Sequence, residues 1–179
     1  MKKLFANCSR AIALFMVLTL AFVACGSQGS TSNSNGPVTV HLGYFANLTH
    51  GVALVGVANG TFQKALGSNV TIKPVIFSAG PAEIEALFAG DIDIGFVGPS
   101  PAINGFVKSH GQALRIIAGA SSGGVLFVVR PGANIKTAQD LSGKKIADPQ
   151  LGGTQDVSLR YYLQQNGLKP ADKGGTVQI

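Results

Sequence analysis

The residues best suited to binding chemistry are small and polar, and they stand in loops before expected helices. The segment Gln150–Asp156 reads Gln-Leu-Gly-Gly-Thr-Gln-Asp, so its two glycines allow a tight turn and Thr154 stands where a helix begins. A hydroxyl group beside unpaired backbone N–H groups can receive a sulfonate, a nitrate or a carboxylate. The pattern equally fits a threonine that only caps the helix, and it lacks the Gly-Lys-Ser/Thr ending of a P-loop.

Two further loops carry hydroxyl groups. In Gly98–Pro101, Ser100 stands between two prolines after an apolar run, where the loop either caps a helix or offers N–H groups to an anion. Ser121 and Ser122 stand between two apolar runs, either in a plain hairpin loop or in a crossover that lines a cleft.

Catalytic and metal chemistry find little support. Asp91 and Asp93 flank one isoleucine and could pair as acid and base, but a solvated strand start explains them more simply. There is no Gly-x-Ser-x-Gly motif, and both cysteines, Cys8 and Cys25, precede the folded part. The histidines have no metal-ligand spacing, so we expect no metal and no cofactor.

The elements that position these loops alternate between two periods. Strand patterns occupy 38–44, 70–77, 92–97, 114–119 and 125–129, and helical patterns occupy 52–66, 82–89 and 102–109. After residue 132 the pattern restarts with a turn at 140–145, a strand at 146–147, a helix at 156–166 and a strand at 174–179. Such alternation predicts an α/β fold with a mainly parallel sheet covered on both faces. Ligands of such sheets bind at the carboxyl ends of the strands. The candidate loops are therefore 45–51, 78–81, 98–101 and 120–124.

The N-terminal residues read as an export signal. Lys2, Lys3 and Arg10 precede an uncharged apolar run at 11–24, which is short for a membrane span. The segment resembles a bacterial lipoprotein signal, which implies that Cys25 is lipidated, although Phe22 stands where such signals carry an aliphatic residue. An ordinary signal peptide and an uncleaved anchor are the alternatives. Residues 25–37 read as a flexible tether.

Charge argues weakly for a nucleic-acid partner. The formal net charge is +6, but three of the 14 basic residues and none of the 8 acidic ones lie in the signal, which leaves +3 for the rest. Nucleic acid is therefore not an expected partner. The last strand pattern stops at Ile179 without a partner, so we expect the sequence to be a C-terminally truncated fragment.

Several motifs in order resemble the substrate-binding lipoproteins of bacterial ABC importers, in the nitrate/sulfonate/taurine family. They are Val-His-Leu-Gly-Tyr-Phe at 40–45, Ala-Gly-Pro at 79–81, Ala-Gly-Asp-Ile-Asp-Ile-Gly at 89–95, Asp-Leu-Ser-Gly-Lys-Lys-Ile-Ala at 140–147 and Gly-Gly-Thr-Gln-Asp at 152–156. The resemblance implies an α/β, type II periplasmic-binding fold, with two lobes joined by a hinge. Lobe one would be 38–121, and 122–179 would be an incomplete lobe two.

The resemblance also implies a site and partners. Its ligand-binding residues would be Asn47, His50, Ser78, Gly80, Ser100, Ser121, Ser122, Gly153, Thr154 and Gln155, with Ser100, Ser122 and Thr154 the strongest candidates. The protein would be a lipid-anchored, extracytoplasmic monomer that captures a small anion and delivers it to an ABC permease and its ATPase. It would not be an enzyme.

Three alternatives remain open from the sequence. A receptor for a flat heterocycle, such as a thiamin pyrimidine precursor, would use Tyr44, Phe45 and His50 to stack or hydrogen-bond. An enzyme on the same fold fits poorly with an exported chain, since metabolite and cofactor supply is cytoplasmic. A structural or adhesive lipoprotein would have no closing cleft.

Overall fold

The structure is a computed structural model that describes residues 36–123 and 125–179. The expected signal, Cys25 and nearly all of the expected tether lie outside the described residues. Residues 36–179 form a unit separate from residues 1–35. Among the described helices, none has the length and apolar character that a membrane crossing requires. The expected lobe boundary at 121/122 stays a prediction.

A three-stranded parallel sheet organises the first half of this unit. Strand β1 (Val38–Phe45) lies between β2 (Val70–Phe77) and β3 (Ile94–Gly95), in the order β2-β1-β3. The register pairs Val38 with Val70 and Gly43 with Gly95. The predicted strands at 38–44 and 70–77 and their parallel pairing are confirmed.

The third strand is shorter than the predicted 92–97. The N–H of His41 donates to the carboxylate of Asp93 at 2.7 Å. At this end of the sheet the acceptor is therefore a side chain instead of a backbone carbonyl of the neighbouring strand. The same bond lowers the pKa of the Asp93 carboxyl. Asp93 therefore has a structural role, and the acid–base pairing with Asp91 gains no support from it.

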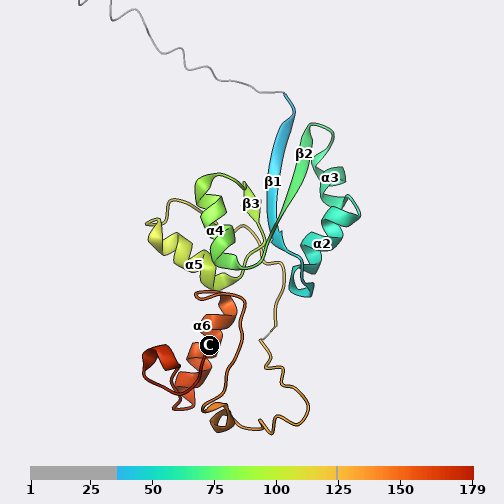
Figure 1. The fold of residues 1–179 in the computed structure, drawn as a ribbon. Coiled ribbons are helices and arrows are strands. Elements are labelled where there is room, and N and C mark those ends of the chain that lie inside the picture. Colours follow the sequence, from blue (N-terminus) through green and yellow to red (C-terminus); the bar gives the residue numbers. More distant parts are fainter. Residues whose placement is uncertain (1–35, 124) are drawn as a thin grey trace, which may run out of the picture. The chain divides into compact units, whose positions relative to one another are not determined.

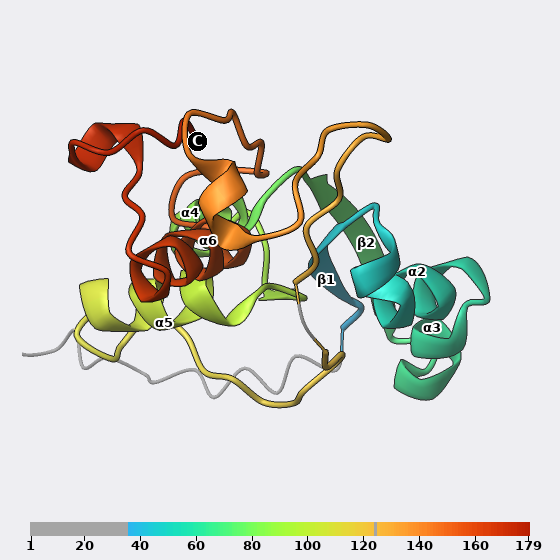
Figure 2. The ribbon, with the colours of Figure 1, turned by 90° about the horizontal axis from the view of Figure 1, so that it is seen from below.

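Helices cover both faces of the sheet, as predicted (Figures 1 and 2). Helices α2 (Gly51–Ala58) and α3 (Thr61–Leu66) lie on one face, and α4 (Gly80–Ala89) and α5 (Pro99–Lys108) lie on the other. On the α2 face, Leu42, Tyr44 and Ala53 form a buried core with Phe62 and Phe96 packed against it.

The single helix predicted at 52–66 is divided in two. Gly60 adopts a left-handed conformation with φ of 64°, which ends α2 and starts α3 in a new direction. A side chain at this position would be strained, so the glycine is a break rather than a weak point in one helix.

The strands predicted at 114–119 and 125–129 are wrong. The structure assigns no strand to either range, and their side chains are exposed, with Ile117 78% and Val128 94% accessible. A strand needs a neighbour that takes up its backbone N–H and C=O groups, and the described residues provide none for these two runs. Apolar composition alone therefore overstated the extent of the sheet.

The second half of the unit has a small core of its own. The elements are η2 (Ala138–Leu141), α6 (Thr154–Gln165) and η3 (Ala171–Lys173). Leu141, Leu159, Leu163 and Val177 are buried together. The predicted strands at 146–147 and 174–179 are reduced to isolated parallel bridges, Lys145 with Gln178 and Pro170 with Val177.

A buried carboxyl group lies between α4 and the sheet. Glu83 is only 1% exposed, and neither carboxylate oxygen has a hydrogen-bond partner among the described residues. A Cβ atom on Gly43 would stand 2.6 Å from Glu83 Oε1, and one on Gly95 would overlap the same oxygen. Because Gly43 pairs with Gly95, the two glycines together make the space that the carboxyl occupies. Burial raises the pKa of Glu83 to about 7.

This burial predicts a pH dependence of stability. The folded state binds the Glu83 proton more tightly than the unfolded chain, whose pKa is near 4.5. The contribution of Glu83 is therefore fully favourable below pH 4.5, and it is lost as the pH rises to about 7 and beyond. We expect Glu83→Gln to remove this loss, so that the variant gains about 3 kcal/mol relative to wild type between pH 4.5 and pH 8.5.

Urea denaturation at several pH values measures this difference. Glu85→Gln, at an exposed position of the same helix, is the matched control and should follow the wild type. A constant difference between Glu83→Gln and wild type across this range would show that the carboxyl is solvated in the folded state.

Candidate ligand-binding site

Helices α4, α5 and α6 begin without a side-chain capping hydrogen bond, as α2 and α3 also do. The N-cap residues of α4, α5 and α6 are Ala79, Gly98 and Gly153, and none makes a side-chain capping hydrogen bond. Alanine and glycine have no side-chain acceptor, so the first N–H groups of each helix are left for another partner. Thr154 is thus not the N-cap of its helix, so the capping interpretation of that residue is wrong. The loop at 98–101 does cap α5, but through Gly98 and not through Ser100.

The N termini of α4 and α5 lie against each other. A Cβ atom on Gly80, at the start of α4, would overlap the ring of Pro101 in the first turn of α5. Only glycine permits this approach. Gly80 is buried at the contact, in the loop where the sheet rules place a ligand.

The N terminus of α6 meets that of α5. A Cβ atom on Gly98 would overlap the hydroxyl oxygen of Thr154. The Thr154 Oγ1 atom is buried and has no hydrogen-bond partner among the described residues. Gly98 and Thr154 are 56 positions apart in the sequence and lie in contact here. Because α5 begins against both α4 and α6, the N termini of the three helices converge.

The donors at this junction can be counted from the backbone. Prolines 81, 99 and 101 have no N–H, so the unpaired N–H groups of the first turns come from Gly80, Ala82, Ser100, Thr154, Gln155 and Asp156. The positive ends of three helix dipoles add to these donors. This arrangement favours a small anion with several oxygen atoms.

An ion-pair network holds the loop before α6. Asp156 is 2% exposed, and its carboxylate accepts from the N–H of Gly152 at 2.9 Å and from Arg160 Nε at 2.7 Å. Arg160 also donates to Asp172 at 2.9 Å. The Gly152–Gly153 turn is thereby fixed, and with it the orientation of Thr154.

A second carboxyl group lies close to this network. The pKa of Asp148 is raised, first by burial and then by the negative charge of Asp156. The carboxylate oxygen Oδ2 of Asp148 is buried without a hydrogen-bond partner in the described residues. The start of α6 thus combines donors for an anion with a neighbouring acidic side chain.

The first loop uses its polar groups locally. Asn47 Oδ1 caps η1 (Leu48–His50) by accepting from the N–H of Thr49 at 3.1 Å. His50 is buried, its Nδ1 accepts from the N–H of Phe45 at 3.2 Å, and its ring lies 4.2 Å from that of Phe45. Burial lowers the pKa of His50, so the ring is neutral at neutral pH with its proton on Nε2.

The remaining predicted residues divide between the junction and the surface. Gly80, Ser100, Gly153, Thr154 and Gln155 belong to the helix starts that converge, and Ser78 is exposed two residues before α4. Ser121 and Ser122 are exposed in a segment without helix or strand. Across 36–123 and 125–179, no hydrogen bond joins Asn47, His50, Ser121 or Ser122 to the junction, so their part in binding stays a prediction.

Sequence reasoning placed Gly98, Pro101 and Asp156 in candidate segments but gave none of them a role in the site. The sequence Gly-Pro-Ser-Pro could have indicated the first two. The two prolines have no backbone N–H, so the serine is the one hydrogen-bond donor of the first helical turn. The spacing of Asp156 and Arg160, four residues apart on one helix, carried the signal for the ion pair.

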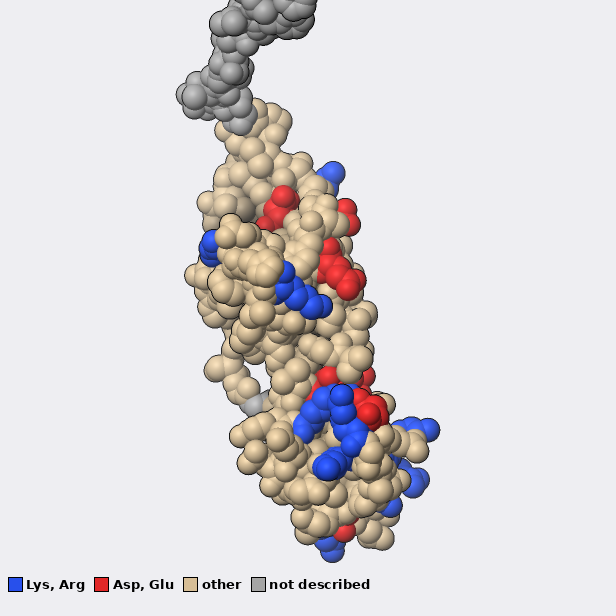
Figure 3. Space-filling model, turned by 90° about the vertical axis from the view of Figure 1, so that its left-hand side faces the viewer, with Lys and Arg blue, Asp and Glu red and all other residues tan. Residues whose placement is uncertain are grey.

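Within the described ranges, no group of three or more His, Cys, Asp or Glu is arranged to hold a metal ion. Figure 3 shows acidic and basic side chains interspersed on the face that it presents, among a larger uncharged surface.

The chain is similar in sequence to a known family and to curated binding proteins. A sequence model of the NMT1-like family matches residues 33–179. The taurine-binding periplasmic protein of Escherichia coli is 29% identical over 164 residues, covering 92% of this chain and 45% of the relative. A binding protein of Brucella abortus is also 29% identical, covering 88% of this chain and 46% of the relative. The chain thus spans about half the length of these curated relatives.

A solved structure confirms the fold class. The alkanesulfonate-binding protein SsuA of Xanthomonas axonopodis, bound to MOPS, superimposes with a TM-score of 0.54 at 26% identity. The match covers 75% of this chain and 45% of that protein. The predicted α/β fold of a periplasmic binding protein is therefore confirmed.

The ion pair at α6 generates a test of stability. Asp156→Asn leaves Arg160 with only the exposed Asp172 and weakens the bond to Gly152, so we expect the free energy of unfolding to fall by about 2 kcal/mol. Urea denaturation measures this loss. Asp172→Asn is the matched control at the exposed end, and it should cost less than about 1 kcal/mol. Equal losses in the two variants would refute the special role of Asp156.

Proposed function

Because the chain belongs to the NMT1-like family, we propose that it is the extracytoplasmic solute-binding component of an ABC importer. Its ligand is a small oxyanion, namely taurine, another aliphatic sulfonate or nitrate. It delivers this ligand to a membrane permease driven by an ATPase. The role is binding and release without chemical change, and it needs no cofactor.

One observation carries the proposal. The uncapped N termini of α4, α5 and α6 converge on the unpaired hydroxyl of Thr154. A sulfonate has three oxygen atoms, and each can accept from a different helix start. Backbone N–H groups bind such an anion without a countercharge from lysine or arginine. The names of the taurine-binding and alkanesulfonate-binding relatives support the same ligand class.

The amino group of taurine would need a negative partner. Asp148 supplies one beside the start of α6, where its Oδ2 atom is unpaired among the described residues. A zwitterion would therefore place its sulfonate on the helix starts and its ammonium group towards Asp148. Nitrate and simple alkanesulfonates have no such group and would leave this carboxyl unused.

The heterocycle alternative loses part of its support. Tyr44 is 6% exposed and packs in the hydrophobic core with Leu42 and Ala53. The Tyr44 side chain therefore packs on the α2 face of the sheet and is not accessible for stacking on a ligand. The ring of His50 likewise contacts the ring of Phe45 in its own chain, at an interplanar angle of 34°.

Titration calorimetry with taurine, ethanesulfonate and nitrate tests the ligand class. We expect Thr154→Val to weaken binding about tenfold, because it replaces one hydrogen bond to a charged group with a methyl contact. Thr154→Ser keeps the hydroxyl and is the matched control, with binding close to wild type. The proposal would be contradicted if none of the three anions bound. Binding of a pyrimidine in their place would identify the protein as a heterocycle receptor.

The anchor is a separate part of the proposal. Cys25 would carry the lipid and hold the receptor at the membrane through the tether at 25–37, with the protein acting as a monomer. Expression of the chain in a bacterial host with a radiolabelled fatty acid should label wild type and fail to label Cys25→Ser. Cys8→Ser is the control and should retain the label. Equal labelling of the two variants would contradict lipidation at Cys25.

A further inference from the structure

Among the strands of residues 36–123 and 125–179, the outer strand of the sheet has one edge without a neighbour. Strand β2 pairs with β1 alone, and the other side of β1 is taken by β3. The N–H of Val38 donates to the carbonyl of Asn69, so odd-numbered residues of β2 face β1. In a parallel pair, alternate residues direct both backbone groups to the same side. Residues 70, 72, 74 and 76 therefore direct their N–H and C=O groups outwards.

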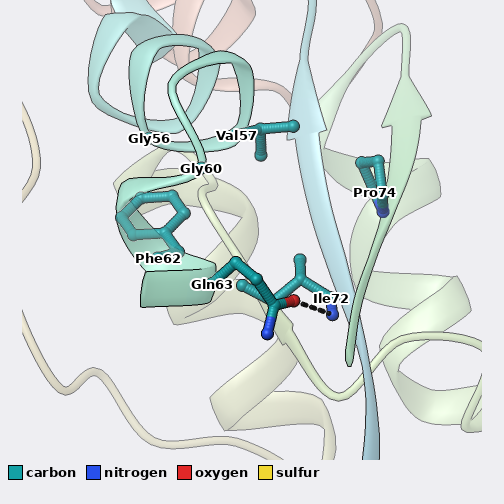
Figure 4. Close-up of a pocket in the computed structure, with 7 residues that line it drawn as sticks. All are labelled: Gly56, Val57, Gly60, Phe62, Gln63, Ile72 and Pro74. Carbon is teal, nitrogen blue, oxygen red and sulfur yellow. Dashed lines mark hydrogen bonds between the residues drawn. The ribbon is translucent and has the colours of Figure 1, made fainter. Parts of the chain in front are cut away.

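The side chain of Gln63, on α3, occupies this outer edge. Its Oε1 atom accepts from the N–H of Ile72 at 3.3 Å, and its Nε2 atom donates to the carbonyl of Val70. The amide group thus makes the two bonds that a peptide group of a neighbouring strand would make. Figure 4 shows Gln63 reaching across to Ile72.

The positions on either side of Ile72 are closed by other means. The N–H of Val70 donates to the carbonyl of Gly67 at 3.5 Å, in the turn that precedes the strand. Pro74 has no N–H to offer, and proline within a strand is found at edges for this reason. Three successive outward positions therefore have no N–H available for another strand. Ile76 is the first outward residue beyond them, and it is 62% exposed.

Gln63 is itself held in place. Its Nε2 atom also donates to the carbonyl of Gly67 at 3.0 Å, which ties the side chain to the end of its own helix. The pocket beside it, lined by Phe62, Gln63, Ile72 and Pro74 among others, has a volume of ≈ 90 Å³. Ligand pockets for small molecules are of the order of 300 Å³ or more. The pocket is thus a gap next to the edge rather than a ligand site.

We propose that Gln63 and Pro74 close the outer edge of β2 against strand addition by a second copy of this chain. A second copy is the relevant partner because it carries the same β2 sequence, Val-Thr-Ile-Lys-Pro-Val-Ile-Phe, which is rich in β-branched residues. An uncovered edge of this kind is a template for pairing with an identical strand. Closure of the β2 edge does not depend on the identity of the proposed ligand.

Hydrogen exchange on the purified full chain tests the first step. In Gln63→Ala at low protein concentration, we expect the amide of Ile72 to exchange about tenfold faster than in wild type, since it loses its acceptor. Lys64→Ala, at the next exposed position of α3, is the matched control and should leave this amide unchanged. Gln63→Glu keeps an acceptor for Ile72 and should retain most of the protection.

The double variant Gln63→Ala, Pro74→Val tests the second step. We expect its β2 amides at residues 72, 74 and 76 to regain protection as the concentration rises, together with a dimer or larger species in light scattering. Circular dichroism verifies that the variant is folded, and Gln63→Ala alone serves if it is not.

Two results would overturn the proposal. One is an Ile72 amide that exchanges at the same rate in Gln63→Ala and wild type. The other is self-association that is equal in wild type and in the opened variants, with β2 exchange independent of concentration. The second result would direct attention to the exposed apolar run at 125–129 instead.

Discussion

Strand β1 hydrogen-bonds in parallel to β2 on one side and to β3 on the other, and this pairing determines where the helices start. Parallel strands must be joined by crossovers, so every helix that follows a strand begins at the same end of the sheet. The N termini of α4 and α5 meet there because Gly80 has no side chain to hold them apart. Gly98 does the same for α6. The proposed oxyanion site would thus depend on strand direction and on two missing Cβ atoms, with few specialised side chains.

The polar groups of this protein fall into two sets that differ in what satisfies them. Asp93, Gln63 and Asn47 complete the backbone hydrogen bonding of strands or helices, and each is occupied by its own chain. Thr154, Asp148 and Glu83 have buried oxygen atoms without partners in the described residues. Buried unpaired polar atoms cost free energy, so they mark positions where a ligand, a proton or water supplies the missing partner. Thr154 and Asp148 belong to the proposed site, whereas Glu83 lies between α4 and the sheet.

Much of the fold could be predicted from local patterns. Periodicity and turn residues predicted the strands at 38–44 and 70–77, the helices at 82–89 and 156–166 and the parallel sheet, although α4 and α6 each begin two residues earlier than predicted. The runs at 114–119 and 125–129 carry the same apolar signal but have no strand beside them, and sequence periodicity contains no information on that neighbour. Thr154 was named as a site residue from a loop motif, and its part in binding stays a prediction. The contacts of Gly98 with Thr154 and of Gly80 with Pro101 were not predicted, because they join residues far apart in the sequence.

The order of the strands has a consequence for how the chain acquires its structure during synthesis. β1 is the first element of the sheet, yet its partners lie 32 and 52 residues further along, as the pairs Val38–Val70 and Leu42–Ile94 show. Closing such loops precedes any gain from pairing, which slows folding compared with local helix formation. The N-terminal segment therefore leaves the ribosome well before its strand can pair. During this interval β1 has no partner strand, and under the proposed export its translocation would compete with folding for the same residues.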